Sequence, residues 1–144
     1  AGYWRDPENT AKAIRDGWLR TGDMAYMDEE RYIFIAGRKN DMIKRGGEKI
    51  YPQEIEDILF DHPAVLEAAV CGIADPDWGE TPRAYIVVRA GYQLSDKELL
   101  AHCADRLPTF KCPQDVVFLA ELPKTSSGKI TRTGLQQLNV SSSN

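Results

Sequence analysis

The sequence has no apolar run long enough to cross a membrane, and its amino terminus has no apolar segment of the kind found in signal peptides. It also has no excess of basic residues. Its 18 Lys and Arg residues are outnumbered by 22 Asp and Glu residues, which gives a formal net charge of −4. Nucleic-acid-binding domains are normally basic, so this balance argues against a nucleic-acid partner. We expect a cytoplasmic protein with no transmembrane segment.

Cysteine is scarce, with three residues and no close CxxC pair. An odd number without that spacing argues against a disulfide framework and against a zinc site. We therefore expect Cys71, Cys103 and Cys112 to be reduced and mostly buried thiols, and we predict no metal ligands in this chain.

The 144 residues match the size of about one domain, and a hydrophobic content of 42% with 28% charged residues is ordinary for a globular protein. The first residues, AGYWRDPENTAKAI, read as though they begin in mid-fold, and the last, NVSSSN, are polar. We expect a piece of a larger protein that still has a hydrophobic core of its own.

Apolar periodicity and turn residues predict an α+β fold. The expected helices are one from a cap at Asn9 or Thr10 to Arg15, one from Pro52 to Pro63, one after a Ser95–Glu98 capping box, and a short last one over 131–138. The expected strands are a hairpin within 24–38, a second hairpin around Gly46-Gly47, and core strands at 64–73, 84–90 and 115–120, with a loop over 74–83. Together they predict a small sheet of about three core strands with helices packed on one side, and a β-hairpin near the N-terminus.

The stretch LPKTSSGKITR, residues 122–132, places a lysine after a glycine in a hydroxyl-rich loop, an arrangement that often binds phosphate. It is not a P-loop, because Pro123 stands where the first glycine is needed and Ile130 where Ser or Thr must follow the lysine. Taken alone, it is also compatible with an ordinary surface loop.

The stretch GRKNDMIKRGGEK, residues 37–49, gathers basic side chains in an otherwise acidic chain. It is either a solvated hairpin face or a site for an anionic ligand such as a nucleotide. Gly46 and Gly47 are either simple turn residues or positions where a ligand passes close to the backbone. In a third stretch, GWLRTGD, Asp23 is either a turn residue or a carboxylate that accepts two hydrogen bonds from a ribose diol.

In this order and spacing, GWLRTGD, GRKNDMIKRGGEKIYPQEIE and LPKTSSGKITR resemble the carboxyl-terminal end of the acyl-adenylate-forming enzymes. This AMP-binding superfamily includes acyl-CoA synthetases, adenylation domains of peptide synthetases and luciferases. The resemblance runs from about residue 3 to about 138. It implies the end of a large N-terminal domain at 1–36, a small mobile C-terminal domain at 37–140, and a frayed tail at 141–144.

The resemblance also implies roles in adenylation. Lys129 would be the catalytic lysine, which contacts the substrate carboxylate and the α-phosphate region of ATP while two anions are brought together. Asp23 would hold the ribose hydroxyls, and Arg38 would help to bind the nucleotide. Asn40 stands at the hinge position, which is commonly Asp or Lys in the family. Asn tolerates unusual backbone angles, and Asp41 beside it could share the hinge role.

For the second half-reaction, the resemblance implies that the small domain rotates to a second pose. A loop would then line the tunnel for the pantetheine arm of CoA, and two residues of PTFKCPQ would contact the CoA nucleotide. The residues concerned are Lys44, Gly46, Gly47 and Glu48 in the loop, and Phe110 and Lys111 in PTFKCPQ. In some relatives, basic residues occur near this contact with the CoA nucleotide. In this sequence the neighbouring residues Cys112 and Gln114 are not basic.

The function expected from this resemblance is that of a ligase, an ATP-dependent acyl-CoA synthetase. A carboxylate and ATP give acyl-AMP and pyrophosphate, and acyl-AMP and CoA then give acyl-CoA and AMP. The partners are a small-molecule carboxylic acid and the missing N-terminal domain, and Mg²⁺ is expected with ATP at a site outside this chain. The alternatives are an adenylation domain that loads a carrier protein and a non-catalytic binding or regulatory fragment. The isolated chain is expected to be inactive.

Overall fold

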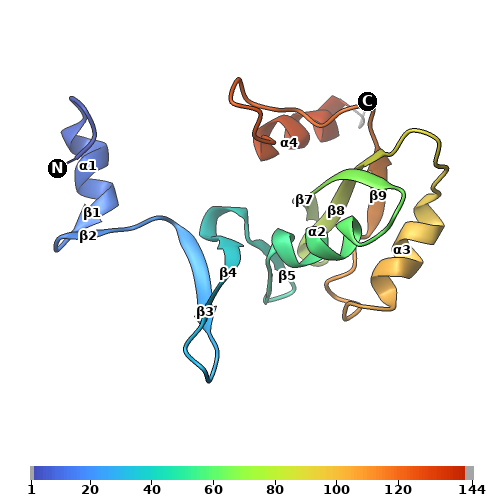
Figure 1. Cartoon of the computed structure of the whole chain (residues 1–144), viewed down its shortest axis with the longest axis horizontal. Coiled ribbons are helices and arrows are strands. Elements are labelled where there is room, and N and C mark those ends of the chain that lie inside the picture. The colour runs from blue at the N-terminus through green and yellow to red at the C-terminus, as the bar shows by residue number, and fades with distance from the viewer. Residues whose placement is uncertain (1, 142–144) are drawn as a thin grey trace. The chain divides into compact units, whose positions relative to one another are not determined.

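The computed structural model describes residues 2–141. The chain divides into two compact units, Ala1–Asn40 and Asp41–Asn144 (Figure 1). The predicted boundary at residue 36 falls inside a strand of the first unit, and the division into the end of a large domain and a mobile domain stays a prediction. The tail predicted at 141–144 lies, apart from Ser141, outside the described residues.

The first unit begins with a short helix followed by two hairpins. Its elements are α1 (Pro7–Ala13), β1 (Ile14–Arg15), β2 (Trp18–Leu19), β3 (Asp23–Met27) and β4 (Ile33–Arg38). The cap predicted at Asn9 or Thr10 is wrong. Asp6 caps the helix, because its carboxylate accepts hydrogen bonds from the backbone and side chain of Asn9 (3.0 and 2.6 Å) and Pro7 suits the first helical position. These hydrogen bonds lower the pKa of the Asp6 carboxyl.

Strands β3 and β4 pair antiparallel and form the hairpin that the sequence predicts near the N-terminus. The rings of Tyr26 and Phe34 stack across it, with centroids 5.3 Å apart. Large apolar side chains of this unit are nevertheless exposed, among them Trp18 (80%), Ile33 (72%) and Ile35 (69%). A group of exposed apolar side chains of this kind is typical of a surface that contacts another part of a protein.

The second unit is built on a five-stranded sheet, which confirms the α+β class. The strands are β5 (Ile43–Arg45), β6 (Glu48–Ile50), β7 (Val65–Asp75), β8 (Gly79–Val88) and β9 (Asp115–Phe118), in the order β6-β5-β8-β7 with β9 paired to β8. Strands β7, β8 and β9 are the three predicted core strands. The predicted glycine hairpin, β5–β6, joins them through one pair of residues, Arg45 and Gly79.

The loop predicted over 74–83 is mostly strand. Strands β7 and β8 pair from Val65 to Val88 and are joined by a tight turn. The carboxylate of Asp75 accepts hydrogen bonds from the backbone N–H groups of Asp77 and Trp78 (2.9 Å each) and so forms this turn. The Pro, Asp and Gly residues that suggested a long loop are concentrated at this turn.

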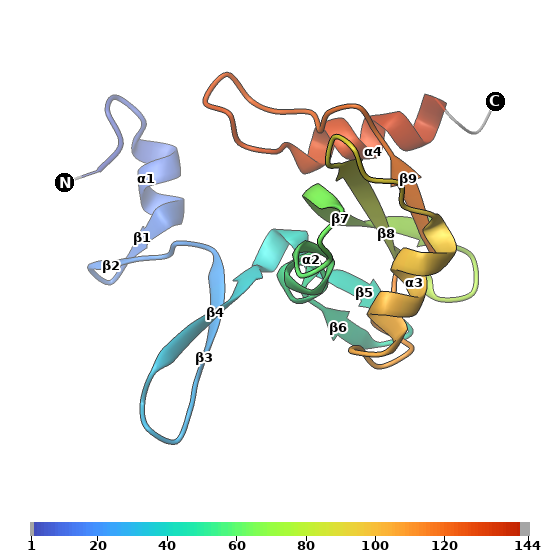
Figure 2. The same cartoon turned by 45° about the vertical axis from the view of Figure 1, so that its right-hand side comes forward.

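Helices cover both faces of the sheet, so the prediction that they pack on one side is wrong (Figure 2). The helices are α2 (Pro52–Phe60), α3 (Asp96–Ala104) and α4 (Arg132–Ser141), and a 3₁₀ turn, η1, covers Lys39–Asp41. Helices α2 and α3 bury their apolar residues against one set of strand side chains, which includes Val70 and Ile86. Leu135 of α4 packs with Cys71 and Tyr85, which point to the opposite face because side chains alternate along a strand.

The predicted helix starts of α2 and α3 are confirmed. Pro52 occupies the first turn of α2, and the Ser95 hydroxyl accepts a hydrogen bond from the Glu98 backbone N–H (3.2 Å) at the start of α3. The carboxylate of Glu98 lies 3.9 Å from the His62 ring. Helix α3 is thereby capped at its own N-terminus and tied to the end of α2.

The cysteine thiols are mostly buried, as predicted. Cys71 and Cys103 are buried and Cys112 is half-buried. Burial raises the pKa of all three thiols, that of Cys103 to about 11. Separately, no helix within residues 2–141 is long and apolar enough to span a membrane.

The packing of α4 predicts a stability difference between two leucines on that helix. Leu135 is fully buried, so Leu135→Ala should lower the free energy of unfolding of the 144-residue chain by about 2–5 kcal/mol. Leu138 is 41% exposed, so Leu138→Ala should cost less than about 1 kcal/mol. Urea denaturation measures both, and equal losses would show that α4 does not pack on this face.

Candidate active site

The loop that carries Lys129 lies between β9 and α4 and is a small hairpin. Lys124 and Ile130 pair antiparallel, and the Thr125 N–H donates a hydrogen bond to the Lys129 carbonyl (2.7 Å). Gly128 turns the chain with a φ of +80°. The loop therefore has hydrogen bonds of its own that define the backbone on which Lys129 is presented.

Lys129 differs from the other two basic side chains of its motif. Lys124 pairs with Glu67 (Nζ to Oε1, 2.5 Å), and Arg132 pairs with Asp41 and Glu56. Within the described part of the chain, Lys129 makes no ion pair, and its side chain is exposed. Its ammonium group is thus available to an anionic ligand.

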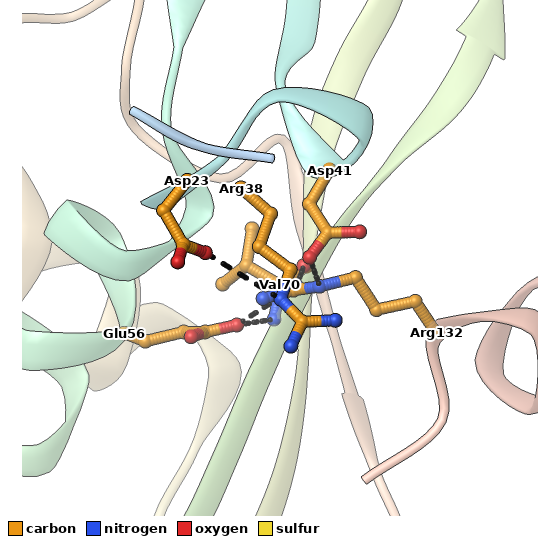
Figure 3. Close-up of polar contacts among 6 residues, drawn as sticks. All are labelled: Asp23, Arg38, Asp41, Glu56, Val70 and Arg132. Carbon is orange, nitrogen blue, oxygen red and sulfur yellow. Dashed lines mark hydrogen bonds and ion pairs between the residues drawn. The ribbon is translucent and has the colours of Figure 1, made fainter. Parts of the chain in front are cut away.

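Arg132 has the most extensive set of polar contacts near this loop (Figure 3). Its Nε lies 3.0 Å from Asp41 Oδ2, and its Nη1 lies 3.0 Å from Glu56 Oε1 and donates to the carbonyl of Val70. Glu56 is buried, and its Oε1 also accepts a hydrogen bond from the Val70 N–H (2.8 Å). The sequence predicted Glu56 only as an acidic residue suited to the positive N-terminus of the helix and gave Arg132 no role, although a glutamate within the apolar pattern of α2 was a usable signal.

Asp23 and Arg38 lie opposite each other on β3 and β4, so the structure brings these two predicted nucleotide residues together. Arg38 Nε is 3.8 Å from Asp23 Oδ1, as Figure 3 shows, and the side chains are 71% and 38% exposed. At that exposure the pair adds little to stability, so the carboxylate and the guanidinium can both contact a ligand. Asn40 follows in the turn η1 and is the last residue of the first unit.

The two glycines of the β5–β6 turn both have positive φ angles, +56° for Gly46 and +90° for Gly47, which explains the Gly-Gly sequence. They differ in their surroundings. The Gly46 N–H donates to the Trp78 carbonyl (2.8 Å), and a Cβ at Gly46 would lie 2.8 Å from the Trp78 ring. A Cβ at Gly47 would have no atom within 4 Å, so a side chain there would project into open space.

A cavity of about 470 Å³ lies beside this turn. The residues that line it are Arg45, Gly46, Glu48, Trp78, Thr109 and Phe110. Three of them were predicted as CoA residues from two distant segments, namely Gly46, Glu48 and Phe110. Arg45 lies within the predicted loop from Lys44 to Glu48 but was not named as a CoA residue. Trp78 and Thr109 were missed, although an aromatic residue at the tip of a Pro- and Asp-rich turn, such as Trp78, was a possible signal.

Arg45 connects the parts of this cavity. Its guanidinium donates a hydrogen bond to the Phe110 carbonyl (2.8 Å) and lies 5.8 Å from the centre of the Trp78 ring. Lys44, Gly47 and Lys111 were predicted with this group but do not line the cavity. The ammonium group of Lys111 contacts both carboxylate oxygens of Glu54 (2.7 and 2.8 Å), which already neutralise its charge.

Among residues 2–141, no group of three His, Cys, Asp or Glu side chains is arranged to hold a metal ion. From the sequence, Mg²⁺ is expected with ATP at a site outside this chain. That the ion binds with ATP elsewhere in a larger enzyme stays a prediction.

Known sequences resemble this chain over nearly its whole length. The pattern of the AMP-binding enzyme C-terminal domain family matches residues 54–129. The long-chain-fatty-acid–CoA ligase of Bacillus subtilis (strain 168) is 48% identical over 134 residues, which are 93% of this chain and 24% of that ligase. The 2-succinylbenzoate–CoA ligase of Bacillus mycoides (strain KBAB4) is 44% identical over 137 residues, which are 95% of this chain and 28% of that ligase.

Solved structures also resemble this chain. The o-succinylbenzoate CoA synthetase (MenE) of Bacillus subtilis, in complex with the acyl-adenylate intermediate OSB-AMP, matches with a TM-score of 0.88 and 38% identity over 94% of this chain and 28% of its own. ATP-bound MatB from Rhodopseudomonas palustris matches with a TM-score of 0.84 and 36% identity over 95% of this chain and 27% of its own. The chain thus spans about a quarter of the length of these relatives. It belongs to the AMP-binding enzyme C-terminal domain family, the carboxyl-terminal domain of the adenylate-forming acyl-CoA ligases.

Proposed function

We propose that this chain is the mobile C-terminal domain of an ATP-dependent acyl-CoA synthetase and supplies groups to both half-reactions. In the first, a carboxylate attacks the α-phosphate of ATP and pyrophosphate leaves. In the second, the CoA thiol attacks the acyl-AMP carbonyl and AMP leaves. The names of the similar ligases favour CoA over a carrier protein as the acceptor.

The proposal rests chiefly on the exposure of Lys129 and on its lack of an ion-pair partner among the described residues. This residue is an exposed lysine on a hydrogen-bonded hairpin, and no carboxylate of the described residues neutralises it. In adenylation a carboxylate approaches a phosphate, and their mutual repulsion raises the barrier. A compact ammonium group placed between them offsets both charges as they redistribute. Lys129 is suited to this role by its position on the loop and by its free charge.

The nucleotide would also be held by Asp23 and Arg38. The Asp23 carboxylate accepts hydrogen bonds and can take two from the ribose hydroxyls, while Arg38 beside it can bind phosphate or the adenylate. Both side chains are exposed enough to do so without breaking a buried ion pair.

The cavity beside the β5–β6 turn is the proposed site for CoA. Its volume of about 470 Å³ is within the usual range for ligand pockets. Trp78 and Phe110 present aromatic surfaces on which a purine ring can stack, and Arg45, which contacts both residues, can serve as a phosphate-binding cation. Arg45 is a better candidate for that role than Lys111, because Glu54 already pairs with Lys111. Gly47 would leave room for the pantetheine arm.

The two proposed sites are far apart on the second unit. Figures 1 and 2 both show the Lys129 loop, drawn in orange above the sheet, at the opposite end of the unit from the β5–β6 turn. One substrate cannot meet both sites at once without a change of pose. Rotation about Asn40 would present them in turn to an active site on the N-terminal domain, which is the proposed partner of the chain. The exposed apolar side chains of the first unit are suited to contact that domain.

The isolated chain should therefore form no acyl-AMP, because the active site is proposed to lie on the N-terminal domain. With ATP and a panel of carboxylic acids, the 144 residues alone should release no pyrophosphate above the rate without protein. A pyrophosphate-release assay measures this, and substantial turnover by the chain alone would contradict the proposal.

Lys129 and Gly47 should separate the two half-reactions in a full-length enzyme that carries this segment, or in the Bacillus subtilis long-chain relative with its C-terminal segment replaced by this chain. Lys129→Ala should lower acyl-AMP formation by about a hundredfold or more, because one preorganised charge contact is lost. It should still convert supplied acyl-AMP and CoA to thioester. Gly47→Leu should do the reverse, because its side chain would enter the pantetheine path.

Gly91→Leu is the matched control for Gly47→Leu. Gly91 has a φ of +84°, and a Cβ added there would have no atom within 4 Å, so the backbone strain is comparable, but it lies in the turn before α3. Each half-reaction is assayed separately, with a melting curve for each variant. Normal adenylation by Lys129→Ala would refute the proposed role of Lys129. Equal losses of thioester formation in Gly47→Leu and Gly91→Leu would show that the Gly47 effect comes from backbone strain alone.

A further inference from the structure

We propose that Arg132 is a positioning residue, which fixes the Lys129 loop to the body of the domain and to Asp41, the first residue after the proposed hinge. This inference rests on the proposed role of Lys129 in adenylation. The role of Arg132 differs from that of Lys129, because Arg132 need not touch any substrate. Its partners all belong to this chain.

The contacts of Arg132 make it a bridge between three segments. Its guanidinium reaches Asp41 at the start of the second unit, Glu56 on α2 and the carbonyl of Val70 on β7. Its side chain is 27% exposed, that of Asp41 28% and that of Glu56 9%. A planar guanidinium can bind two carboxylates and a carbonyl with separate N–H groups, whereas a lysine ammonium cannot match this fork.

The other end of the loop is held to the same strand. Lys124 Nζ lies 2.5 Å from Glu67 Oε1, and Glu67, like Val70, is on β7. The Thr131 N–H donates to the Pro123 carbonyl (2.9 Å), which closes the loop between the two attachments. Lys129 therefore sits on a hairpin with both ends fixed to β7. Its position follows the orientation of the whole unit rather than the motion of a free loop.

The pair between Arg132 and Asp41 extends this connection to the hinge. Asp41 directly follows Asn40, so the orientation of the chain where it leaves the hinge is tied to the base of the Lys129 loop. A rotation at Asn40 would then place Lys129 accurately, as one rigid body. Accuracy matters, because a misplacement of about 1 Å at a catalytic group can cost about a hundredfold in rate.

The test uses two variants in the same full-length enzyme. Arg132→Lys keeps a positive charge but loses the fork, and Asp41→Asn removes only the hinge-side charge and leaves Glu56 paired. Arg83→Lys is the matched control, since Arg83 also forms a half-buried ion pair on this sheet, with Asp115 of β9 at 2.7 Å. For each variant one measures the two half-reactions, the KM values, the melting temperature, and hydrogen exchange of the amides in residues 124–131.

Arg132→Lys should lower kcat for acyl-AMP formation by up to about a hundredfold, with KM for ATP and acid little changed and thioester formation from supplied acyl-AMP retained. Amide exchange in the loop should become faster. Asp41→Asn should lower adenylation in the same direction with the melting temperature unchanged, and Arg83→Lys should leave the ratio of the two half-reactions as in the wild type.

If Asp41→Asn forms acyl-AMP at the wild-type rate, the link between Arg132 and the hinge is overturned. This result remains decisive even if Arg132→Lys does not fold. Equal losses in both half-reactions, in proportion to melting temperature, would reduce Arg132 to a structural residue and overturn the proposal. Lys129→Ala, measured in parallel, tests the proposed function separately. If it adenylates normally, that function fails, while loop exchange still reports whether Arg132 holds the loop.

Discussion

A buried carboxylate, that of Glu56, is the constraint on which much of the domain depends. Moving an unpaired charge out of water costs several kcal/mol, so this side chain must be fully paired. Its partners are the Val70 N–H and Arg132. Glu56 lies on α2, which covers one face of the sheet, and Arg132 begins α4, which covers the other. The two helices thus meet at β7, the edge strand, and the same pair that joins the layers also holds the base of the Lys129 loop.

This arrangement suits a domain that works as a rigid body. The loop that carries Lys129 lies at one end of the unit, and the β5–β6 turn lies at the other (Figures 1 and 2). The cavity with Arg45 and Trp78 is beside this turn. In the proposed function, neither site needs to change shape between the half-reactions, because a rotation at Asn40 exchanges them. In this proposal, the core and the ion pairs keep the second unit rigid, and the rotation takes place at Asn40.

Features set by local chemistry could be predicted from the sequence. The Gly46-Gly47 hairpin, the start of α2 at Pro52 and the Ser95 cap all follow from residues within one turn. The features that could not be predicted depend on distant partners. The face of the sheet on which α4 packs is decided by Leu135 meeting Tyr85, and the cavity arises because the Trp78 turn and Phe110 meet the hairpin. The roles of the three motifs came from resemblance, whereas Arg132 and Glu56 became visible only when their contacts were seen.

The central claim is that the unit after Asn40 takes two orientations, one for each half-reaction. It is tested most directly by the distance between a dye at Lys97, an exposed position on α3, and a second dye on the N-terminal domain of the full-length enzyme. Single-molecule energy transfer should show one distance with acid and ATP and a shift to a second distance when CoA is added. Asn40→Pro, which restricts φ at the proposed hinge, should hold one of the two. A single distance that ATP, acid and CoA all leave unchanged would contradict the account.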